Sequence, residues 1–577
     1  MCAPVMTRTI ISELLILYFF SSCGNLSDKN AEIKPGLYEG HDFVCDSGVV
    51  VSAHPESSRI GVEVLRKGGN AVDAAVATEF ALAVCYPEAG NIGGGGFMLV
   101  REASGRTDLI DYREKAPLKA SRDMYLDPSG NSVPGLSTET HKASGVPGTV
   151  DGMLNIHAKY GILSFRDVIQ PAIDLARNGF PVTRDQADDL NGNREDFISR
   201  NLSPPAFVKD LPWNEGDTLR QPDLANTLER IRDYGRDGFY SGKTARLIVK
   251  EMQRGNGLIS FQDLSDYNSL FRDPVSGYYR GYRIISASPP SGGGVILLQV
   301  LGMIEPYNLK KLGFHSWQSV HLISEAEKRA FADRSQFLGD PDYMVVPIEA
   351  MLNSEYLLGR MSGFSMESAS PSSEILPGSP LVDESEETTH YSVVDPMGNS
   401  VAATTTLNGT FGSRIVIDSA GFLMNNQMDD FSVKPGVPNM YGLVGGEVNS
   451  VQPGKKMLSS MTPVIVEKDN RLFMVAGSPG GSTIPTSVLQ VILNVIDYKM
   501  TLSRAVREGR FHHQWLPDHI SYEKNSLDTA TLLKLTKMGH AIMPRNTIGR
   551  VNAIMILPDG RKEGGADPRG NNVADGY

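Results

Sequence analysis

The chain has 577 residues, of which 41% are apolar and 21% are charged, and its formal net charge is −12. This length exceeds that of one small domain, and the composition excludes wholesale disorder. The sequence has no long Lys/Arg run, which excludes a nucleic-acid binder with a basic face. Its four cysteines are too sparse for a disulfide scaffold and match no zinc pattern.

The N-terminus is typical of an export signal. Arg8 precedes an apolar stretch over 10–20 that is too short to span a bilayer, and small residues then lead to Cys23. Small residues before a cysteine resemble a bacterial lipoprotein cleavage site, so we expect either lipidation of Cys23 or a plain signal peptide cut nearby. The sequence therefore predicts a signal peptide over 1–23, a tether over 24–44, and an exported protein that is periplasmic or lipid-anchored in the bacterial envelope.

The region from 56 to 350 is predicted to be mainly helical. Asn70 opens an Ala-rich helix that runs to about Cys85, and Ser164 caps a helix that is closed by Gly179. Further helices are predicted over 223–234 and 243–253, and a longer amphipathic helix is predicted over 316–337.

Two glycine-containing motifs in this region do not predict nucleotide binding. The segment Ser241 to Thr244 resembles part of a phosphate loop, but Asp237 stands where that loop needs a glycine. We interpret it as a helix start. The run from Gly90 to Gly96 is not a dinucleotide fingerprint, and we expect it to let backbones approach closely.

The character of the chain changes after residue 363. A polar stretch over 363–387 predicts a mobile loop. Strands then follow over 390–394, 401–407, 463–466 and 472–475, and helices return at about 487–509. Helices and strands together predict a layered α/β architecture.

Two predicted hairpins bring hydroxyl, amide and free backbone N–H groups close to Thr388. If the first turns between Met397 and Gly398, Thr388 lies opposite Leu407, within about one residue of register, with Thr406 and Asn408 beside it. The second would turn at 469–470 and set Ser459 opposite Gly480. Consecutive glycines at 480–481 can present backbone N–H groups to an oxyanion.

A threonine hydroxyl is a poor nucleophile without a base, but an N-terminal threonine can use its own α-amine. The α-amine has a reference pKa of about 7.7–8.0, which suits catalysis near neutral pH. Such a mechanism requires a cut between Glu387 and Thr388, and the polar stretch before Thr388 suits it. From these residues alone, two hairpins with hydroxyls paired in turns remain the competing interpretation.

Seven motifs in order resemble the γ-glutamyltranspeptidase family of self-cleaving N-terminal nucleophile hydrolases, over roughly residues 45–577. They are Gly93 to Met98, Asp111 to Glu114, Thr388 to Val394, Asn425 to Phe431, Leu458 to Met461, Gly477 to Ser482 and Phe511 to Gln514. The resemblance implies a four-layer αββα fold, cut into a large subunit (45–387) and a small catalytic subunit (388–577) that stay associated.

The resemblance also implies a role for each matching residue. Thr388 would cut the chain after Glu387 and then attack the γ-carbonyl of glutathione or another γ-glutamyl donor. Thr406 would orient Thr388, and Gly480 and Gly481 would hold the oxyanion. The donor α-carboxylate would be bound by Arg113, Ser459 and Ser460, and the α-ammonium by Asn408, Gln427 and Asp430. Water, an amino acid or a dipeptide would accept the acyl group, with no cofactor or metal.

Finer features bear on the substrate. Residues 438–446 look like the family's lid loop, with Tyr441 able to wall the pocket near Asn408, which favours small donors. Retained Asp430 and Tyr441 argue against the related acylases, which stay an alternative together with a poly-γ-glutamate hydrolase and an uncleaved binding protein. The family commonly has Arg where Thr483 stands, so a charge at the pocket rim is expected to be lost. That leaves the acceptor preference and the hydrolysis-to-transfer ratio open. The adjacent His512 and His513 point apart and do not predict a metal site.

Overall fold

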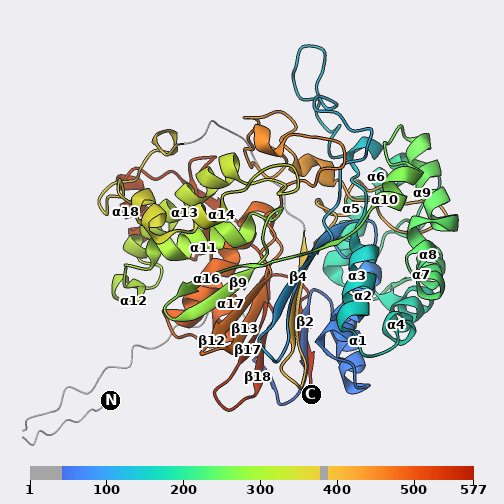
Figure 1. The fold of residues 1–577 in the computed structure, drawn as a ribbon, viewed down its shortest axis with the longest axis horizontal. Coiled ribbons are helices and arrows are strands. Elements are labelled where there is room, and N and C mark those ends of the chain that lie inside the picture. Colours follow the sequence, from blue (N-terminus) through green and yellow to red (C-terminus); the bar gives the residue numbers. More distant parts are fainter. Residues whose placement is uncertain (1–41, 377–387) are drawn as a thin grey trace, which may run out of the picture. The chain divides into compact units, whose positions relative to one another are not determined.

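Two seven-stranded sheets stack face to face in the computed structural model, which describes residues 42–376 and 388–577 (Figure 1). The predicted signal peptide with Cys23, residues 24–41 of the tether and Glu387 lie outside the described residues. One sheet has the order β19 (Val573–Gly576), β2 (Val49–Ser52), β10 (Thr389–Val394), β11 (Ser400–Thr406), β3 (Gly95–Arg101), β4 (Thr107–Asp111) and β7 (Leu270–Arg272).

The second sheet also mixes strands from before and after Thr388. Its order is β1 (Phe43–Cys45), β18 (Lys562–Gly565), β17 (Asn552–Ile556), β13 (Arg471–Gly477), β12 (Val464–Lys468), β9 (Tyr282–Ser286) and β8 (Val275–Tyr279). The predicted large and small subunits are therefore not separate domains, because each contributes strands to both sheets.

Helices cover the outer face of each sheet (Figure 1). On the first sheet α2 (Ala71–Cys85) contacts β10 and β11, and α1 (Pro55–Arg66), α3 (Thr149–Tyr160), α4 (Phe165–Asn178) and α7 (Pro222–Tyr234) lie on the same side. On the second sheet α11 (Gly293–Ile304) contacts β8 and β9, and α16 (Ile484–Ile496) contacts β13, with α13 (Trp317–Phe337) packed against α11. The predicted four-layer αββα arrangement is confirmed.

The space between the sheets is filled by apolar side chains from both. Phe97 and Leu99 of β3 meet Ile465 of β12 and Val475 of β13 in one buried cluster. Because helices cover the outer faces, the central strands are buried on both sides, and β10 and β11 are buried throughout.

The remaining elements are short. Two small sheets pair β14 (Phe511–His512), β15 (Ile520–Glu523) and β16 (Ile542–Arg545), and β5 (Phe180–Pro181) with β6 (Thr218–Leu219). The other helices are α5 (Arg184–Gly192), α6 (Arg194–Arg200), α8 (Asp237–Tyr240), α9 (Gly242–Arg254), α10 (Phe261–Asp266), α12 (Leu309–Leu312), α14 (Ile348–Met351), α15 (Ser354–Arg360), α17 (Leu502–Arg507) and α18 (Thr529–Lys537).

The predicted helices are confirmed with small changes at their ends. Asn70 and Asp73 form a capping box at the start of α2, and Ser164 caps α4, which ends at Gly179 with φ of 85°. The segment from Ser241 begins α9, as expected. The prediction of an amphipathic helix over 316–337 is wrong in one respect: α13 is buried on every face from Ser319 to Ser335.

The expectation of a mainly helical region before 350 missed β3, β4 and β7 to β9. Short apolar runs have no period long enough to separate a buried strand from a helix. In the first hairpin the register differs by one residue from the prediction, since Thr389 pairs with Thr405. In the second, the predicted register holds near the turn, and an irregularity between Val466 and Glu467 then shifts it by one.

The stretch predicted as a mobile loop is held in place over the part that the structure describes. The Ser372 hydroxyl donates to Trp515 O at 2.6 Å, and Ser370 O accepts from Lys328 Nζ at 2.8 Å. Cys45 and Cys85, the two cysteines among the described residues, are free thiols. None of the helices in 42–376 and 388–577 combines the length and apolar character that a membrane span needs.

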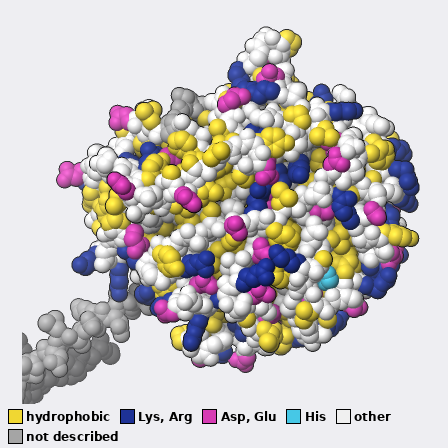
Figure 2. Space-filling model, in the orientation of Figure 1, with side chains coloured by type: hydrophobic (Ala, Val, Ile, Leu, Met, Phe, Trp, Pro, Cys, Tyr) yellow, Lys and Arg dark blue, Asp and Glu magenta, His cyan; other side chains and the backbone are white. Residues whose placement is uncertain are grey.

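Basic and acidic side chains are interspersed over the face of the molecule shown in Figure 2, and hydrophobic side chains gather on its left, over the helices of the second sheet.

Candidate active site

A small pocket, with about 290 Å³ of empty volume, lies at one end of the two stacked sheets. Nine of the eleven residues predicted for catalysis or substrate binding line it: Thr388, Thr406, Asn408, Gln427, Asp430, Tyr441, Ser459, Ser460 and Gly481. The other two, Arg113 and Gly480, lie beside it. A wider hollow between α1 and α4 contains none of these residues, so size alone does not locate the chemistry.

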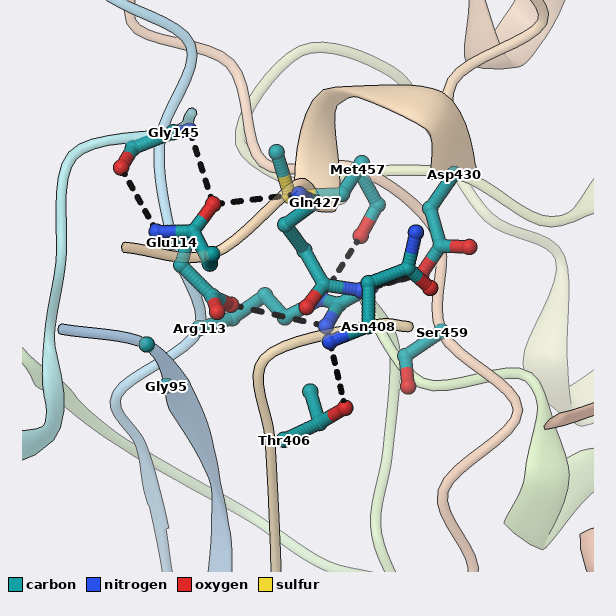
Figure 3. Close-up of polar contacts among 12 residues, drawn as sticks. Gly95, Arg113, Glu114, Gly145, Thr406, Asn408, Gln427, Asp430, Met457 and Ser459 are labelled. Carbon is teal, nitrogen blue, oxygen red and sulfur yellow. Dashed lines mark hydrogen bonds and ion pairs between the residues drawn. The ribbon is translucent and has the colours of Figure 1, made fainter. Parts of the chain in front are cut away.

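Thr388 stands directly before β10, and its side chain is only 4% exposed. Continuing the pairing of Thr389 with Thr405 places it across from Thr406, at the end of β11. The Thr406 hydroxyl accepts a hydrogen bond from the backbone N–H of Asn408 at 2.8 Å, which fixes its orientation (Figure 3).

The glycine run before β3 makes room for this strand end. A Cβ at Gly94 would lie 2.1 Å from Thr406 O, and one at Gly96 would lie 2.2 Å from Thr404 O. No side chain fits there, which is the close backbone approach expected from the sequence. Asn408, at φ of 78°, then turns the chain into the pocket wall.

Gly480 and Gly481 form the opposite wall, between β13 and α16. Both have positive φ, 130° and 51°, and a Cβ on Gly481 would lie 2.6 Å from the Tyr441 ring. Neither N–H donates to another residue that the structure describes. The Thr483 N–H and hydroxyl both donate to Gly480 O at 2.8 Å and close this turn. Thr483 itself is fully buried, and the expected loss of a rim charge stays a prediction.

An ion pair lies under the pocket floor. Arg113 Nη2 pairs with Asp430 Oδ2, and Gln427 Nε2 donates to the same oxygen at 2.7 Å (Figure 3). Arg113 Nη1 lies 3.4 Å from Glu114 Oε2, and Nε lies 3.3 Å from Met457 O. Burial raises the pKa of the Glu114 carboxyl to about 7, although the Arg113 guanidinium opposes this shift.

Ser459 and Ser460 complete this side of the pocket. Hydrogen bonds from Ser459 N to Pro290 O and from Gly292 N to Ser459 O, both 2.8 Å long, hold the segment against the start of α11. The Ser459 hydroxyl accepts from Met461 N at 3.1 Å, whereas the buried Ser460 hydroxyl has no hydrogen-bond partner among the described residues.

Tyr441 closes the pocket from the predicted lid. Its hydroxyl donates to Asn408 O at 2.5 Å, and its carbonyl accepts from Gln514 Nε2 at 3.2 Å. His512 Nε2 lies 2.9 Å from Gln514 Oε1, so part of the 511–514 motif supports the lid. Asp429 accepts from Met440 N at 2.8 Å, and burial raises the pKa of its carboxyl to about 6.

Sequence reasoning missed Arg334, a buried residue near the end of α13 that lines the same pocket. Because the sequence predicted an amphipathic helix here, we expected Arg334 to lie on its solvent-exposed face. Only the packing of α13 beneath the lid reveals its position, since Gly446 N bonds Ser335 O at 3.0 Å.

One group away from the pocket has the composition of a metal site. His321, Glu325 and His540 place their ligand atoms within 4.8 Å of one another. Glu325 is already paired with Lys328 at 3.1 Å and Arg329 at 2.8 Å, and His321 Nδ1 lies 2.7 Å from His540 Nε2. Two cations beside the carboxylate disfavour a third.

The chain matches the family model described as gamma-glutamyltranspeptidase over residues 57–577. It is 48% identical over 541 residues to a glutathione hydrolase proenzyme of Escherichia coli (strain K12), with 93% of each chain covered. The structure of Helicobacter pylori gamma-glutamyltranspeptidase aligns with a TM-score of 0.56 at 45% identity, over 59% of this chain and 97% of that one. A cephalosporin acylase from Bacillus halodurans shares the fold, with a TM-score of 0.81 at 24% identity, over 95% of this chain and 99% of that one.

Proposed function

The chain belongs to the γ-glutamyltranspeptidase family, and on that premise we propose that it cuts itself before Thr388 and then uses Thr388 as its nucleophile. It is a glutathione hydrolase and γ-glutamyltransferase that matures by self-cleavage into two associated subunits. The observation that carries the residue assignment is the position of Thr388. It lies directly before β10, in one pocket with Thr406, Asp430 and Gly481.

In the maturation step the Thr388 hydroxyl attacks the carbonyl carbon of Glu387. The peptide C–N bond breaks, the nitrogen takes up the hydroxyl proton, and an ester joins Glu387 to the Thr388 oxygen. Water then hydrolyses the ester, which leaves a carboxyl group on Glu387 and restores the hydroxyl. Thr388 now carries a free α-amine, the base that its hydroxyl needs.

In the transfer step the α-amine takes the proton of the Thr388 hydroxyl as the oxygen attacks the γ-carbonyl of the donor. The N–H groups of Gly480 and Gly481 stabilise the oxyanion. The amine of the leaving group takes the proton and departs, and a γ-glutamyl ester remains on Thr388. Water, an amino acid or a dipeptide then attacks this ester in the reverse sequence of steps.

The donor head group is an α-amino acid, with an ammonium and a carboxylate on one carbon. Asp430 supplies the negative charge for the ammonium, with oxygens of Asn408 and Gln427 as further acceptors. Arg113, Ser459 and Ser460 lie on the side of the carboxylate. The lid residue Tyr441, whose hydroxyl donates a hydrogen bond to Asn408 O, limits the pocket to a small γ-glutamyl group.

We place the enzyme outside the cytoplasm, after export by the signal peptide over 1–23, in the periplasm or anchored by a lipid on Cys23. Amino-acid and dipeptide acceptors also belong to this proposal. Labelling of the expressed protein with a radioactive fatty acid, compared with its Cys23→Ala variant, separates the two locations.

Mass spectrometry of the purified protein tests the proposal. We expect two fragments, with Thr388 at the N-terminus of the smaller one, and release of p-nitroaniline from γ-glutamyl-p-nitroanilide. The Thr388→Ala variant should stay one chain without activity. Cleavage at the same bond in that variant would remove Thr388 from its role, and a single intact chain in the unmodified protein would overturn the mechanism.

A further inference from the structure

Glu79 is a buried carboxyl group on the α2 side of the first sheet. Its relative exposure is 0%, and neither of its oxygens has a hydrogen-bond partner among the described residues. No charged residue in the described part of the chain lies close enough to balance its charge. A buried carboxylate without a counter-charge is unfavourable, and a cation placed nearby would stabilise it.

The groups that face Glu79 belong to the strands that carry the nucleophile and their neighbours. Burial raises the pKa of the Glu79 carboxyl to about 7, and the hydroxyls of Tyr391 in β10 and Thr405 in β11, which face it, oppose this shift. The Tyr112 hydroxyl lies beside Thr405, and burial raises the pKa values of Tyr112 and Tyr391 well above their usual range, so both stay neutral. Neither tyrosine hydroxyl has a hydrogen-bond partner among the described residues.

The charged residues of the helices around α2 are engaged elsewhere. Of the titratable groups on the described elements packed against α2, only Tyr112 and Tyr391 face Glu79. Three basic residues of these helices form ion pairs with other groups: His157 with Asp73 at 3.2 Å, Arg59 with Glu56 at 2.7 Å, and Arg177 with Glu229 at 2.9 Å.

Glu79 lies close to the backbone nitrogen of Thr388, although α2 and β10 belong to different layers. Thr405, whose hydroxyl faces the carboxyl, pairs with Thr389, and Thr389 follows Thr388 directly. With neighbouring strands about 4.8 Å apart, the Glu79 carboxyl lies within roughly 10 Å of the Thr388 nitrogen. In the uncut chain this nitrogen is a neutral amide. Self-cleavage turns it into an α-amine, whose protonated form is a cation at a residue that is only 4% exposed.

The pocket side offers this new ammonium no free counter-charge. Asp430 and Glu114 both pair with Arg113, and Arg334 adds a second guanidinium to the pocket lining. Burial lowers the pKa of His390, two residues along the chain from the nucleophile, to about 3, so this ring stays neutral. The carboxylate on the α2 side is therefore the anion that can balance the ammonium.

We propose that the Glu79 carboxylate is the counter-charge of the α-ammonium group that self-cleavage creates on Thr388, and that it acts on the nucleophile across the sheet as a positioning residue. This inference rests on the proposed function, since the amine exists only in the cleaved chain. A nearby anion favours the protonated amine, which offsets the burial that disfavours it. The two groups titrate as a pair, and without the carboxylate the amine loses its proton at lower pH.

The test is the pH dependence of kcat/KM for γ-glutamyl-p-nitroanilide between about pH 5 and about pH 9, because its acid limb reports the base of the free enzyme. In Glu79→Gln we expect the acid limb to move to lower pH by about one unit, since two charges roughly 10 Å apart interact that strongly at an effective dielectric constant of about 20. Below about pH 6 the variant should therefore keep a larger share of its maximal kcat/KM than the unmodified enzyme.

Two further variants separate the charge of Glu79 from its packing. Glu79→Asp keeps the charge and should leave the acid limb close to its original position. Thr78→Val is the matched control: it changes the neighbouring residue of α2, whose hydroxyl donates to Ala74 O at 2.8 Å and lies against Gly61 of α1, and it should not move the limb.

An acid limb that stays in place in Glu79→Gln would overturn the proposal. A loss of kcat/KM by the same factor at every pH would also overturn it, because it would indicate a purely structural role. If Glu79→Gln does not fold or cut itself, Tyr391→Phe removes a hydroxyl that favours the Glu79 anion and should move the limb in the same direction by a smaller amount. An unmoved limb in that variant would count equally against the proposal. If the unmodified enzyme turns over γ-glutamyl-p-nitroanilide at no pH, the proposed function itself has failed.

Discussion

The two ends of the stacked sheets use the same kinds of charged residue in opposite ways. Strand β3 runs from Gly95, beside the pocket, to Arg101, about 20 Å away at roughly 3.3 Å per residue. At the Arg101 end, Glu467 of the other sheet pairs with Arg101 at 2.7 Å and with Arg283 at 3.1 Å. At the pocket end, Arg334 Nε, the Ser460 hydroxyl and Gln427 Oε1 have no hydrogen-bond partner among the described residues.

This difference separates a structural role from a binding role. At the Arg101 end the carboxylate charge is balanced inside the protein, so the ion pairs lock the two sheets together. At the pocket end, buried donors and acceptors have no partner in the protein and are available to a ligand. Their desolvation lowers the stability of the free protein until a substrate binds. Substitutions at the two ends should therefore change different quantities.

The largest effect is expected at the pocket end, from Asp430→Asn. The change keeps the shape but removes the negative charge that faces the donor ammonium and pairs with Arg113. Loss of one member of a buried charge pair should lower kcat/KM for γ-glutamyl-p-nitroanilide by about 100-fold or more. Glutaryl-p-nitroanilide lacks the ammonium, and its kcat/KM should fall much less. Parallel losses on both donors would show that Asp430 does not recognise the ammonium.

At the other end, Glu467→Gln should lower stability and leave catalysis unchanged. Arg101 and Arg283 would lose their shared counter-charge in a site where Glu467 is only 3% exposed. We expect a loss of about 3 kcal/mol in the free energy of unfolding. Denaturant unfolding in the Thr388→Ala background, where the chain is expected to stay in one piece, measures this loss. A change of more than about twofold in KM of the cleaved enzyme would contradict the separation of the two ends.

The smallest effect concerns Glu114, which is buried beneath the pocket. Its only ion pair among the described residues is with Arg113 Nη1, at 3.4 Å, so its charge is less well balanced than that of Glu467. Its carboxyl, with a pKa raised to about 7 by burial, is neutral below that pH and anionic above it. The added negative charge should weaken binding of L-glutamate roughly two- to fivefold as the pH rises through 7. Glu114→Gln mimics the neutral form and should remove this step from the inhibition constant measured between pH 5.5 and 8.5. A step that persists in the variant would assign it to another group.

Local signals in the sequence were enough for the helices with clear ends. Asn70 with Asp73, and Ser164 with Gly179, satisfy backbone groups at helix ends by contacts within a few residues, so α2 and α4 follow from the sequence. The first hairpin also followed, since its turn and strands are neighbours in the chain. Its register was one residue off, because a turn alone leaves the pairing partner of Thr388 undetermined.

Contacts between segments far apart in the chain could not be predicted from these local signals. The strands β3 and β4 are short apolar runs whose identity depends on the sheet beside them, and α13 is buried because layers from other parts of the chain surround it. Ordered motifs named most of the pocket residues through a family resemblance, but no spacing placed Arg334 in the same pocket as Ser460.

The sequence by itself determined which residues carry hydroxyl, amide and carboxylate chemistry near Thr388, and where the local turns and caps must lie. Only the tertiary structure decided which of those polar groups have partners. Arg101 and Arg334 have the same side chain, yet Arg101 forms an ion pair with Glu467, whereas Arg334 has no ion-pair partner among the described residues and its Nε no hydrogen-bond partner. The physical reason is that the energy of a buried charge depends on the groups within a few ångströms of it, and these come from segments far apart in the chain.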